Sequence, residues 1–456
     1  MAGSRGAVNH GQMAGPGGGK VRHMAQQTRQ LQFSLQGQGF CDPVGAAFEA
    51  DVRAFDQFGT VSTPLRTPFT VPEVSGSELA VPVYVNEFWT ARQRQANALH
   101  EISYRACFKP QLPRFFIERL TEPGDIVYDP FMGRGTTLLE AQLMGRTPYG
   151  CDASPLCRCL LEPRLDLPSL EAVSARLEAL DLSRRIDVSD ELLTFYHPET
   201  LREIASLRQY LLDRTAAGER DPVDRWIRMV ALNRLTGHST GFFSVYSLPP
   251  NQAVSVQSQR RINQRRKQVP PRRDVRELIM KKSRRLLNQK RREEGGDPDR
   301  APQPFVLLTQ KAQSTPEIPD DSVALVVTSP PFLDVVDYAT DNWLRCWFIG
   351  IDAGEVDMTV PRKLDEWEAV MAHVFFELHR VLRPGGFVAF EVGEVRQGKL
   401  KLESAILRCG FRAGLEPGLV MINDQAFTKT ANCWGVDNNT KGTNTNRIVV
   451  FHKPSS

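Results

Sequence analysis

A serine followed by two prolines is the first place in the chain where residue types suggest chemistry. The segment Thr328-Ser329-Pro330-Pro331-Phe332 comes directly after an apolar run that is typical of a buried strand. Two successive prolines can neither continue a ladder nor start a helix, so they hold the chain extended and leave its carbonyl groups unpaired. With the serine hydroxyl, such carbonyls form a set of fixed hydrogen-bond acceptors, although two prolines alone would more often mark a simple strand exit.

A glycine-containing turn lies upstream, between a predicted strand and a predicted helix. It runs Asp129-Pro130-Phe131-Met132-Gly133-Arg134-Gly135, in the position where α/β sheets bind nucleoside ligands. A dinucleotide site would need glycine or alanine where Leu138 stands, which disfavours a pyrophosphate. Asp152 lies nineteen residues beyond Gly133, about the spacing of a carboxylate that binds ribose hydroxyls, although it could also be an ordinary helix N-cap. The combination suits a nucleoside without phosphates, such as S-adenosylmethionine.

These residues resemble a known family. D-P-F-M-G-R-G-T-T, followed by G-C-D, resembles the cofactor motif of DNA methyltransferases that act on exocyclic amino groups, and the upstream Y-R-A-C-F-K-P is similar to the segment that closes over the methionine part of the cofactor. The resemblance implies S-adenosyl-L-methionine as cofactor. The residues that it places at the cofactor are Tyr104, Phe108, Lys109, Pro110, Asp129, Pro130, Phe131, Gly133, Gly135, Thr136, Thr137, Asp152, Ala153 and Thr328.

In this family D-P-P-Y accompanies adenine-N6 enzymes, whereas S-P-P-Y or S-P-P-F is commonest among cytosine-N4 enzymes. The resemblance therefore implies a site-specific cytosine-N4 DNA methyltransferase with catalytic residues Ser329, Pro330, Pro331 and Phe332. Ser329 Oγ and the Pro330 carbonyl would bind the two N–H groups of the target amine, while Phe332 would stack on a base flipped out of the duplex. Adenine N6, structured RNA as substrate and a non-enzymatic DNA-binding protein are the alternatives.

The elements that position these motifs follow a strand–helix–strand rhythm. Strands are predicted over 125–129 and 147–151 with a helix over 136–144 between them, and the rhythm resumes with strands over 305–308, 322–328, 387–392 and 447–452. A helix over 366–382 precedes the fifth of these strands. We expect a Rossmann-like S-adenosylmethionine-dependent methyltransferase fold with a largely helical insertion. The expected divisions are a flexible arm over 1–45, methyltransferase parts over 46–159 and 301–456, and the insertion over 160–300. No clear element pattern emerges over 46–99.

The insertion carries an uneven share of the charge. The whole chain has a net charge of +4, but residues 253–292 hold fifteen basic residues against two acidic ones, with glutamines among the arginines. Arginine and glutamine can bind base edges and phosphates, so we expect the insertion to recognise the DNA target, although a solvated helix face is the plainer alternative. The residues expected to bind DNA are Arg260, Arg261, Arg265, Arg266, Lys267, Arg272 and Arg273.

Composition excludes several other classes of protein. The 456 residues are 41% hydrophobic and 24% charged, which is ordinary globular usage, and no apolar run approaches the roughly 20 residues of a membrane-spanning helix. The eight cysteines include no C-x-x-C pair, so neither a metal site nor a disulfide scaffold is expected. We therefore expect a cytoplasmic, nucleoid-associated protein of bacterial type, with duplex DNA and a cognate restriction endonuclease as candidate partners and no membrane.

Overall fold

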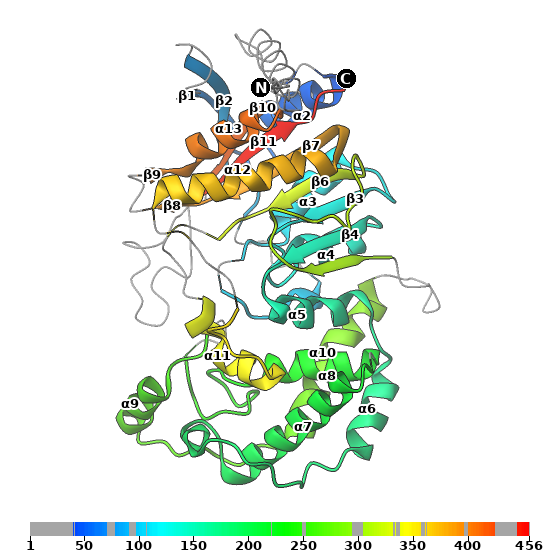
Figure 1. Cartoon of the computed structure of the whole chain (residues 1–456), viewed down its shortest axis with the longest axis vertical. Coiled ribbons are helices and arrows are strands. Elements are labelled where there is room, and N and C mark those ends of the chain that lie inside the picture. The colour runs from blue at the N-terminus through cyan, green and yellow to red at the C-terminus, as the bar shows by residue number, and fades with distance from the viewer. Residues whose placement is uncertain are drawn as a thin grey trace, which may run out of the picture.

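The computed structural model describes residues 40, 42–70, 78–90, 97–105, 107–219, 221–248, 252–293, 304–331, 333, 338–356, 361, 363–395, 400–424 and 445–455. Within these residues the largest sheet has the strand order β5-β4-β3-β6-β7-β11-β10-β2-β1 (Figure 1). Its strands are β1 (Thr63–Thr70), β2 (Glu78–Asn86), β3 (Ile126–Asp129), β4 (Thr147–Asp152), β5 (Val306–Thr309), β6 (Val323–Thr328), β7 (Leu382–Val392), β10 (Glu416–Asp424) and β11 (Thr445–His452). A separate two-stranded sheet pairs β8 (Glu394–Val395) with β9 (Leu400–Lys401).

The direction of the strand order reverses at the centre of the sheet. From β3 the chain moves outward through β4 to β5, and it then returns to the other side of β3 to form β6 and β7, all of them parallel. Beyond β7, the sheet continues through β11, which runs antiparallel to both β7 and β10. In such sheets the ligand binds where the order reverses, outside the carboxyl ends of the strands. This strand order confirms the predicted fold class. By the same rule, we expect a ligand to bind at the boundary between β3 and β6.

Helices cover both faces of the sheet. One face packs against α2 (Pro43–Ala54), α3 (Gln111–Leu120) and α4 (Thr136–Leu143), the other against α12 (Leu364–Val381) and α13 (Leu402–Arg412). Strand β6 serves both cores, because Leu325 and Val327 face the first set of helices and Val326 faces the second. Such a strand, apolar on both faces, is typical of a parallel strand covered on both sides. The two motif-bearing strands are therefore held at the centre of the molecule.

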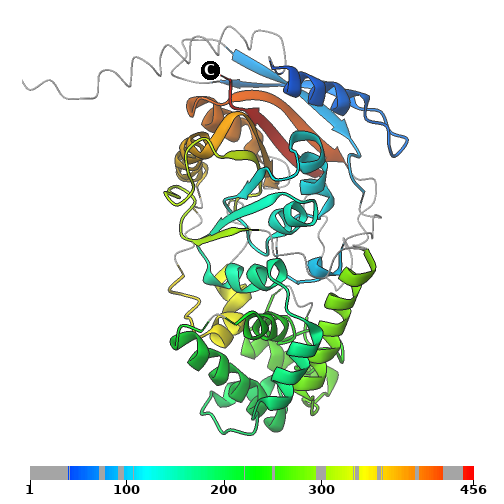
Figure 2. The ribbon, with the colours of Figure 1, turned by 90° about the vertical axis from the view of Figure 1, so that its right-hand side faces the viewer.

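The amino-terminal region contributes to this sheet, which the sequence did not indicate. The hairpin of β1 and β2 extends the sheet, with β2 parallel to β10. Helix α2 is capped by Asp42, whose carboxylate accepts hydrogen bonds from the backbone N–H groups of Val44 and Gly45. Because α2 begins at Pro43 and Phe40 is buried beside it, the expected arm over 1–45 reaches too far; residues 1–39 lie outside the described residues. Figure 2 shows α2 and the hairpin at the opposite end of the molecule from the insertion.

The insertion is helical, and its helices pack around an apolar cluster that extends to neighbouring parts of the chain. Its helices are α6 (Leu170–Ala179), η2 (Asp190–Thr194), α7 (Pro198–Ala216), α8 (Pro222–Leu232), α9 (Val256–Arg266) and α10 (Val275–Glu293). They share one apolar cluster with α5 (Pro155–Leu165), with the short η1 (Ala98–His100) and with α11 (Tyr338–Ile349). The expected division at residue 159 therefore falls inside α5, and α11, which we expected to belong to the carboxyl-terminal part, packs against the insertion.

Candidate functional site at the centre of the sheet

The two motifs meet at the carboxyl ends of β3 and β6. Thr328, the last residue of β6, donates a hydrogen bond from Oγ1 to Asp129 Oδ1 at 2.6 Å, although 199 positions separate the two residues. In the first turn of α4, Thr137 Oγ1 donates to the carbonyl of Val327 at 3.0 Å. Asp129 is almost fully buried, and burial raises the pKa of its carboxyl group to about 7. These hydrogen bonds fix the start of one motif against the start of the other.

The glycine turn adopts a backbone shape that favours glycine. Gly133 and Gly135 have φ values of +48° and +76°, in the left-handed region. A Cβ added to Gly135 would lie 2.4 Å from Leu161 Cδ1, so this glycine also allows α5 to approach closely. The Gly133 N–H donates to Asp152 Oδ2 at 2.9 Å, and the Ser154 N–H donates to Oδ1 at the same distance. Asp152 therefore fixes the turn, and each of its oxygens keeps further acceptor capacity.

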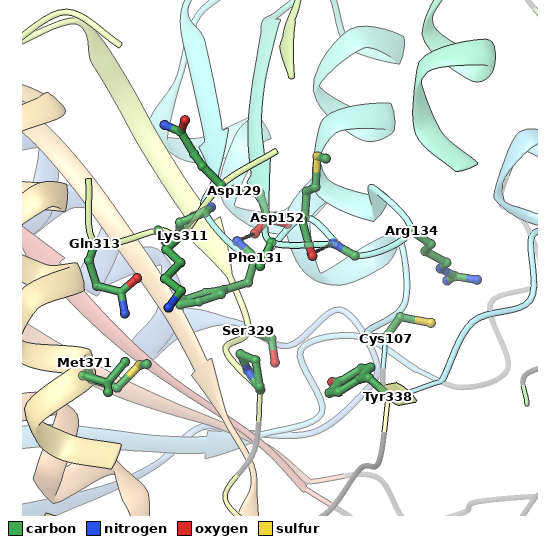
Figure 3. Close-up of a pocket in the computed structure, with 18 of the residues that line it drawn as sticks. Cys107, Asp129, Phe131, Arg134, Asp152, Lys311, Gln313, Ser329, Tyr338 and Met371 are labelled. Atoms are coloured by element: carbon green, nitrogen blue, oxygen red, sulfur yellow. Dashed lines mark hydrogen bonds between the residues drawn. The ribbon is translucent and has the colours of Figure 1, made fainter. Parts of the chain in front are cut away.

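A cavity of about 270 Å³ lies between the glycine turn and the diproline corner. Gly133 and Ser329 both line it, so the structure brings the two predicted motifs to one site. Figure 3 shows Ser329 between Phe131 and Lys311 on one side and Tyr338 and Cys107 on the other. The predicted residues that line the cavity are Tyr104, Phe108, Asp129, Pro130, Phe131, Gly133, Thr136, Asp152, Ala153, Ser329 and Pro331.

The other predicted site residues lie behind the cavity wall or away from it. Gly135, Thr137 and Thr328 support the wall through the contacts above, and Pro330 is buried. Lys109 and Pro110 do not line the cavity, and Pro110 precedes α3 as its N-terminal flanking residue. Phe332, predicted to stack on the target base, lies outside the described residues.

The diproline corner is not as open as the sequence predicted. We expected unpaired carbonyl groups, but the Pro331 carbonyl accepts a hydrogen bond from Trp367 Nε1 at 3.1 Å. Trp367 comes from α12 and also lines the cavity. The expectation was wrong for Pro331 because an aromatic side chain distant in sequence provides the missing donor. The corner is held in place by this bond.

Sequence reasoning missed a buried carboxyl group behind Ser329. Glu391, near the end of β7, is hydrogen-bonded to the Ser329 side chain, and Asn446 Nδ2 donates to Glu391 Oε1 at 2.6 Å. Burial raises the pKa of Glu391, and both hydrogen bonds oppose that rise. A signal existed in the sequence, because a glutamate inside the apolar strand Phe387–Val392 is unusual unless it has buried partners.

Further cavity residues also escaped prediction. Many belong to the loop after β5, at the same carboxyl edge as the motifs, and to α12; they are Cys107, Met132, Arg134, Gln310, Lys311, Ala312, Gln313, Tyr338, Pro361, Trp367, Val370 and Met371. The position of Gln310–Gln313 directly after a predicted strand was an available signal. The sequence carried no signal for the contribution of α12, because that contribution depends on how the helix crosses the sheet.

Two arginines fasten the segment over 99–108 against the glycine turn. Arg134 donates to the carbonyls of His100, Ile102 and Phe108, and extends away from the centre of the cavity (Figure 3). Arg164 is buried and donates to the carbonyls of Leu99, Arg134 and Leu160; burial lowers its pKa to about 9. The segment that the resemblance predicts to close over the cofactor is thus held by guanidinium groups.

The basic block is only partly available to a ligand. Arg260, Arg261, Arg265, Arg266 and Lys267 are exposed on and just after α9, which stands apart from the other helices at the lower left of Figure 1. Arg266 also lies over the ring of Tyr246, with 3.7 Å between the guanidinium carbon and the ring centroid. Arg260 also pairs with Glu191 at 3.6 Å on the surface, and two further predicted DNA-binding residues have structural contacts instead. Arg272 pairs with Glu199 and Glu203, and the backbone of Arg273 is bonded to Thr200.

The interleaved glutamines are also used internally. Gln259 and Gln268 both donate to the carbonyl of Tyr246 and to Asn263 Oδ1, and Gln252 accepts from Arg105. These three glutamine side chains hold α9 and its flanking turns in place. The prediction that glutamines of this segment bind base edges is therefore wrong for these three residues.

Among the described residues, no group of three or more His, Cys, Asp or Glu side chains could hold a metal ion. No helix in the described part of the chain is long and apolar enough to span a membrane.

Comparison with known proteins gives matches concentrated around the cofactor motif. The DNA methylase family covering N6 and N4 enzymes matches residues 75–158. The Type II methyltransferase M.MjaII of Methanocaldococcus jannaschii is 41% identical over 70 residues, 15% of this chain and 13% of that protein. The Type II methyltransferase M.MvaI of Kocuria varians is 32% identical over 97 residues, 21% of this chain and 20% of that protein. The chain thus aligns with a fifth or less of the length of these two relatives.

Two solved structures that match this chain at low similarity are also methyltransferases. An S-adenosylmethionine-dependent methyltransferase from Methanosarcina mazei has 10% identity and a TM-score of 0.30, covering 75% of this chain and 98% of that one. An rRNA methyltransferase from Streptomyces viridochromogenes has 13% identity and a TM-score of 0.25, covering 64% and 78%. Scores this low say nothing about the substrate. Residues 75–158 thus match the DNA methylase family of N6 and N4 enzymes, and these two curated relatives are Type II methyltransferases.

Proposed function

We propose that this protein is a DNA methyltransferase that transfers a methyl group from S-adenosylmethionine to the N4 amino group of a cytosine flipped out of duplex DNA. The observation that carries the proposal is the meeting of the two motifs. The Thr328–Asp129 hydrogen bond of 2.6 Å fixes them together, and Gly133 and Ser329 line the same cavity. A nucleophile and a methyl donor can react only when both are held in line within one such space.

The residues at the glycine turn fit the proposed cofactor. At about 270 Å³ the cavity is close to the lower limit of typical small-molecule sites, roughly 300–1,000 Å³. The half-buried Asp152 carboxylate keeps acceptor capacity for ribose hydroxyls, and Phe131 offers an aromatic face. S-adenosylmethionine supplies a methyl group on a positively charged sulfur, and Asp129 and Asp152 contribute carboxyl groups for a cationic ligand.

Glu391 gives Ser329 a defined role toward the target amine. A serine hydroxyl can donate or accept, but an ionised carboxylate only accepts. When Glu391 is ionised, its hydrogen bond with Ser329 uses the hydroxyl proton and leaves the lone pairs of Ser329 Oγ for an N–H group of the target. Such a fixed acceptor favours the positive charge that develops on the nitrogen. Methylation would leave the amine with one proton in excess, which Ser329 would accept while it passes its own hydroxyl proton to ionised Glu391.

DNA contacts are proposed for the exposed side chains of α9. Arg260, Arg261 and Arg265 are exposed on this helix, which suits contact with phosphates. A cognate restriction endonuclease remains a prediction from the family resemblance.

The proposal is tested by incubating the full chain with labelled S-adenosylmethionine and duplex DNA, followed by mass spectrometry of the nucleosides. We expect N4-methylcytosine. N6-methyladenine alone would contradict the choice of base, and label appearing only in tRNA or rRNA would contradict the choice of substrate. If calorimetry detects no binding of S-adenosylmethionine to the folded chain, the enzymatic function itself is wrong.

A further inference from the structure

A second cleft, of about 540 Å³, lies where the insertion meets the segment over 100–104. The insertion contributes residues from the loop after α8 and from α10. The lining residues are His100, Glu101, Ile102, Ser103, Tyr104, Arg134, Arg234, Ser239, Phe242, Lys282 and Arg285. Tyr104 and Arg134 also line the first cavity, so the two spaces share a wall.

The cleft has a surplus of positive charge. Four of its lining residues are arginine or lysine, and Glu101 is its one carboxylate. Glu101 is already fully used, because one oxygen pairs with Lys282 at 2.8 Å and the other with Arg285 at 2.6 Å. His100 adds no cation, since burial lowers its pKa. The lining therefore presents a net positive charge that no carboxylate within the cleft balances.

Arg234 is the group best placed to take an anion. Its Nη1 donates to the carbonyl of Gly241 at 3.3 Å, and its guanidinium lies over the ring of Phe242 at 4.2 Å. Its Nε, however, has no hydrogen-bond partner among the described residues. Burial and the nearby Arg285 lower the pKa of Arg234 to about 10, a shift that a bound anion would reverse. Arg234 lines the cleft although its Nε is itself buried, and a planar guanidinium in such a lining is suited to an oxygen of a phosphate.

The positive surface continues from the cleft along α10. Lys281, Arg284 and Arg285 are exposed within one turn of this helix, and neither Lys281 nor Arg284 pairs with a carboxylate in the described part of the chain. Residues three and four apart lie on the same helix face, about 5–6 Å from each other. A row of cations that leads out of a basic cleft favours a chain of phosphates over a single small anion.

We propose that this cleft, with the adjoining face of α10, binds backbone phosphates of the DNA strand next to the target base. The inference rests on the proposed function, since it takes DNA as the polyanion. Arg234 would hold one phosphate within the cleft, and Arg284 and Arg285 would hold those that follow. This binding site is separate from α9, and it lies against the segment that separates the cleft from the methyl-transfer cavity.

The test compares two matched double variants of the full chain. R284Q/R285Q removes two exposed charges at the cleft, and R184Q/R185Q removes two exposed charges on the loop after α6. The affinity for a short duplex oligonucleotide is measured over a series of salt concentrations, and calorimetry gives the affinity for S-adenosylmethionine. We expect R284Q/R285Q to lose roughly tenfold in duplex affinity near 0.1 M salt, with the slope of log K against log salt reduced by about 1 to 2.

The control variant should keep the wild-type slope, and both variants should keep wild-type affinity for S-adenosylmethionine. Equal duplex affinity and slope in the two variants would overturn the proposal. R234Q supplies a second test, because a neutral methylphosphonate at the contacted position of the duplex should weaken wild type but not R234Q. Competition with inorganic phosphate is compared with competition by chloride at equal ionic strength. The assignment of Arg234 is wrong if phosphate competes with the duplex no better than chloride and no methylphosphonate position distinguishes R234Q from wild type.

The outcome is separable from that of the proposed function. If wild type transfers no methyl group but R284Q/R285Q loses duplex affinity and salt slope relative to R184Q/R185Q, the proposed function is contradicted and the cleft is supported. If wild type transfers methyl groups but the cleft substitutions have no effect, the proposed function is supported and the cleft proposal is contradicted.

Discussion

Two buried carboxyl groups and one half-buried carboxyl group distinguish this site from an ordinary strand end. Asp129 links the two motifs, Asp152 fixes the glycine turn and Glu391 lies behind Ser329. Burial raises the pKa of all three, so each is costly to ionise in the ligand-free protein. Buried ionisable groups at a cavity with specific partners are typical of functional sites.

Asp129 predicts a pH dependence of cofactor binding. Its pKa of about 7 lies well above the ordinary value of 3.8, so at pH 6 most molecules carry a neutral Asp129. A cationic ligand binds better to the ionised form and must lower this pKa. Affinity for S-adenosylmethionine should therefore rise with pH, being weaker at pH 6 than at pH 8. Calorimetry in buffers of different ionisation enthalpy should show proton release, and D129N should lose the dependence. Equal affinity at both pH values in wild type would contradict this role.

Glu391 predicts a separation of catalysis from binding. E391Q keeps the shape of the side chain but removes the ionised acceptor, so we expect kcat to fall roughly tenfold to a hundredfold while the affinity for S-adenosylmethionine is unchanged. In wild type the rate should fall as pH drops through the raised pKa of Glu391, because the protonated group no longer accepts from Ser329. That acidic limb should be absent from E391Q. A variant with wild-type kcat and pH profile would show that Glu391 has no role beyond packing.

At the scale of elements, the close approach of α5 to the glycine turn sets a steric requirement. Gly135 and Gly145 have nearly equal φ values of +76° and +77°, but the nearest atom to an added Cβ is 2.4 Å away at Gly135 and 4.0 Å away at Gly145. G145A should therefore cost only the backbone strain, about 1 kcal/mol, and G135A about 1–3 kcal/mol more. Denaturant unfolding measures both. Equal losses would mean that α5 does not crowd the turn.

Local sequence patterns predicted the elements that carry the motifs, but not the amino-terminal ones. The predicted strand over 147–151 is observed as Thr147–Asp152, and the predicted helix over 136–144 as Thr136–Leu143, because apolar periodicity and capping residues lie within those segments. Strand β1 gave no signal, since Pro64 and Pro68 are tolerated only in special positions such as an edge strand. The Glu391–Ser329 and Trp367–Pro331 contacts depend on sheet order, which one sequence does not reveal.

At the scale of the whole molecule, the insertion places a basic helix away from the sheet. Much of the +13 charge of residues 253–292 is used internally, as for Arg272 with Glu199 and Lys282 with Glu101. Net charge along a sequence therefore overstates the surface that a polyanion can reach. The exposed cations that remain lie on two helices, α9 and α10, which is why they are assigned separate DNA contacts.

The α9 assignment predicts a salt effect of its own. R260Q/R261Q should weaken duplex binding and reduce the slope of log K against log salt by about 1 to 2, because phosphate contacts release counterions. R184Q/R185Q again serves as the control of equal charge. An α9 variant that behaves like this control would remove α9 from the DNA interface.

The central claim is that Ser329, which lines the cavity, activates the target amine and does not hold the cofactor. S329A tests it most directly, with the single-turnover rate of methyl transfer and the affinity for S-adenosylmethionine measured on the same preparation. We predict a rate loss of roughly a hundredfold or more, as for other groups that stabilise developing charge, with the affinity within about twofold of wild type. A variant that transfers methyl groups at the wild-type rate would contradict the account.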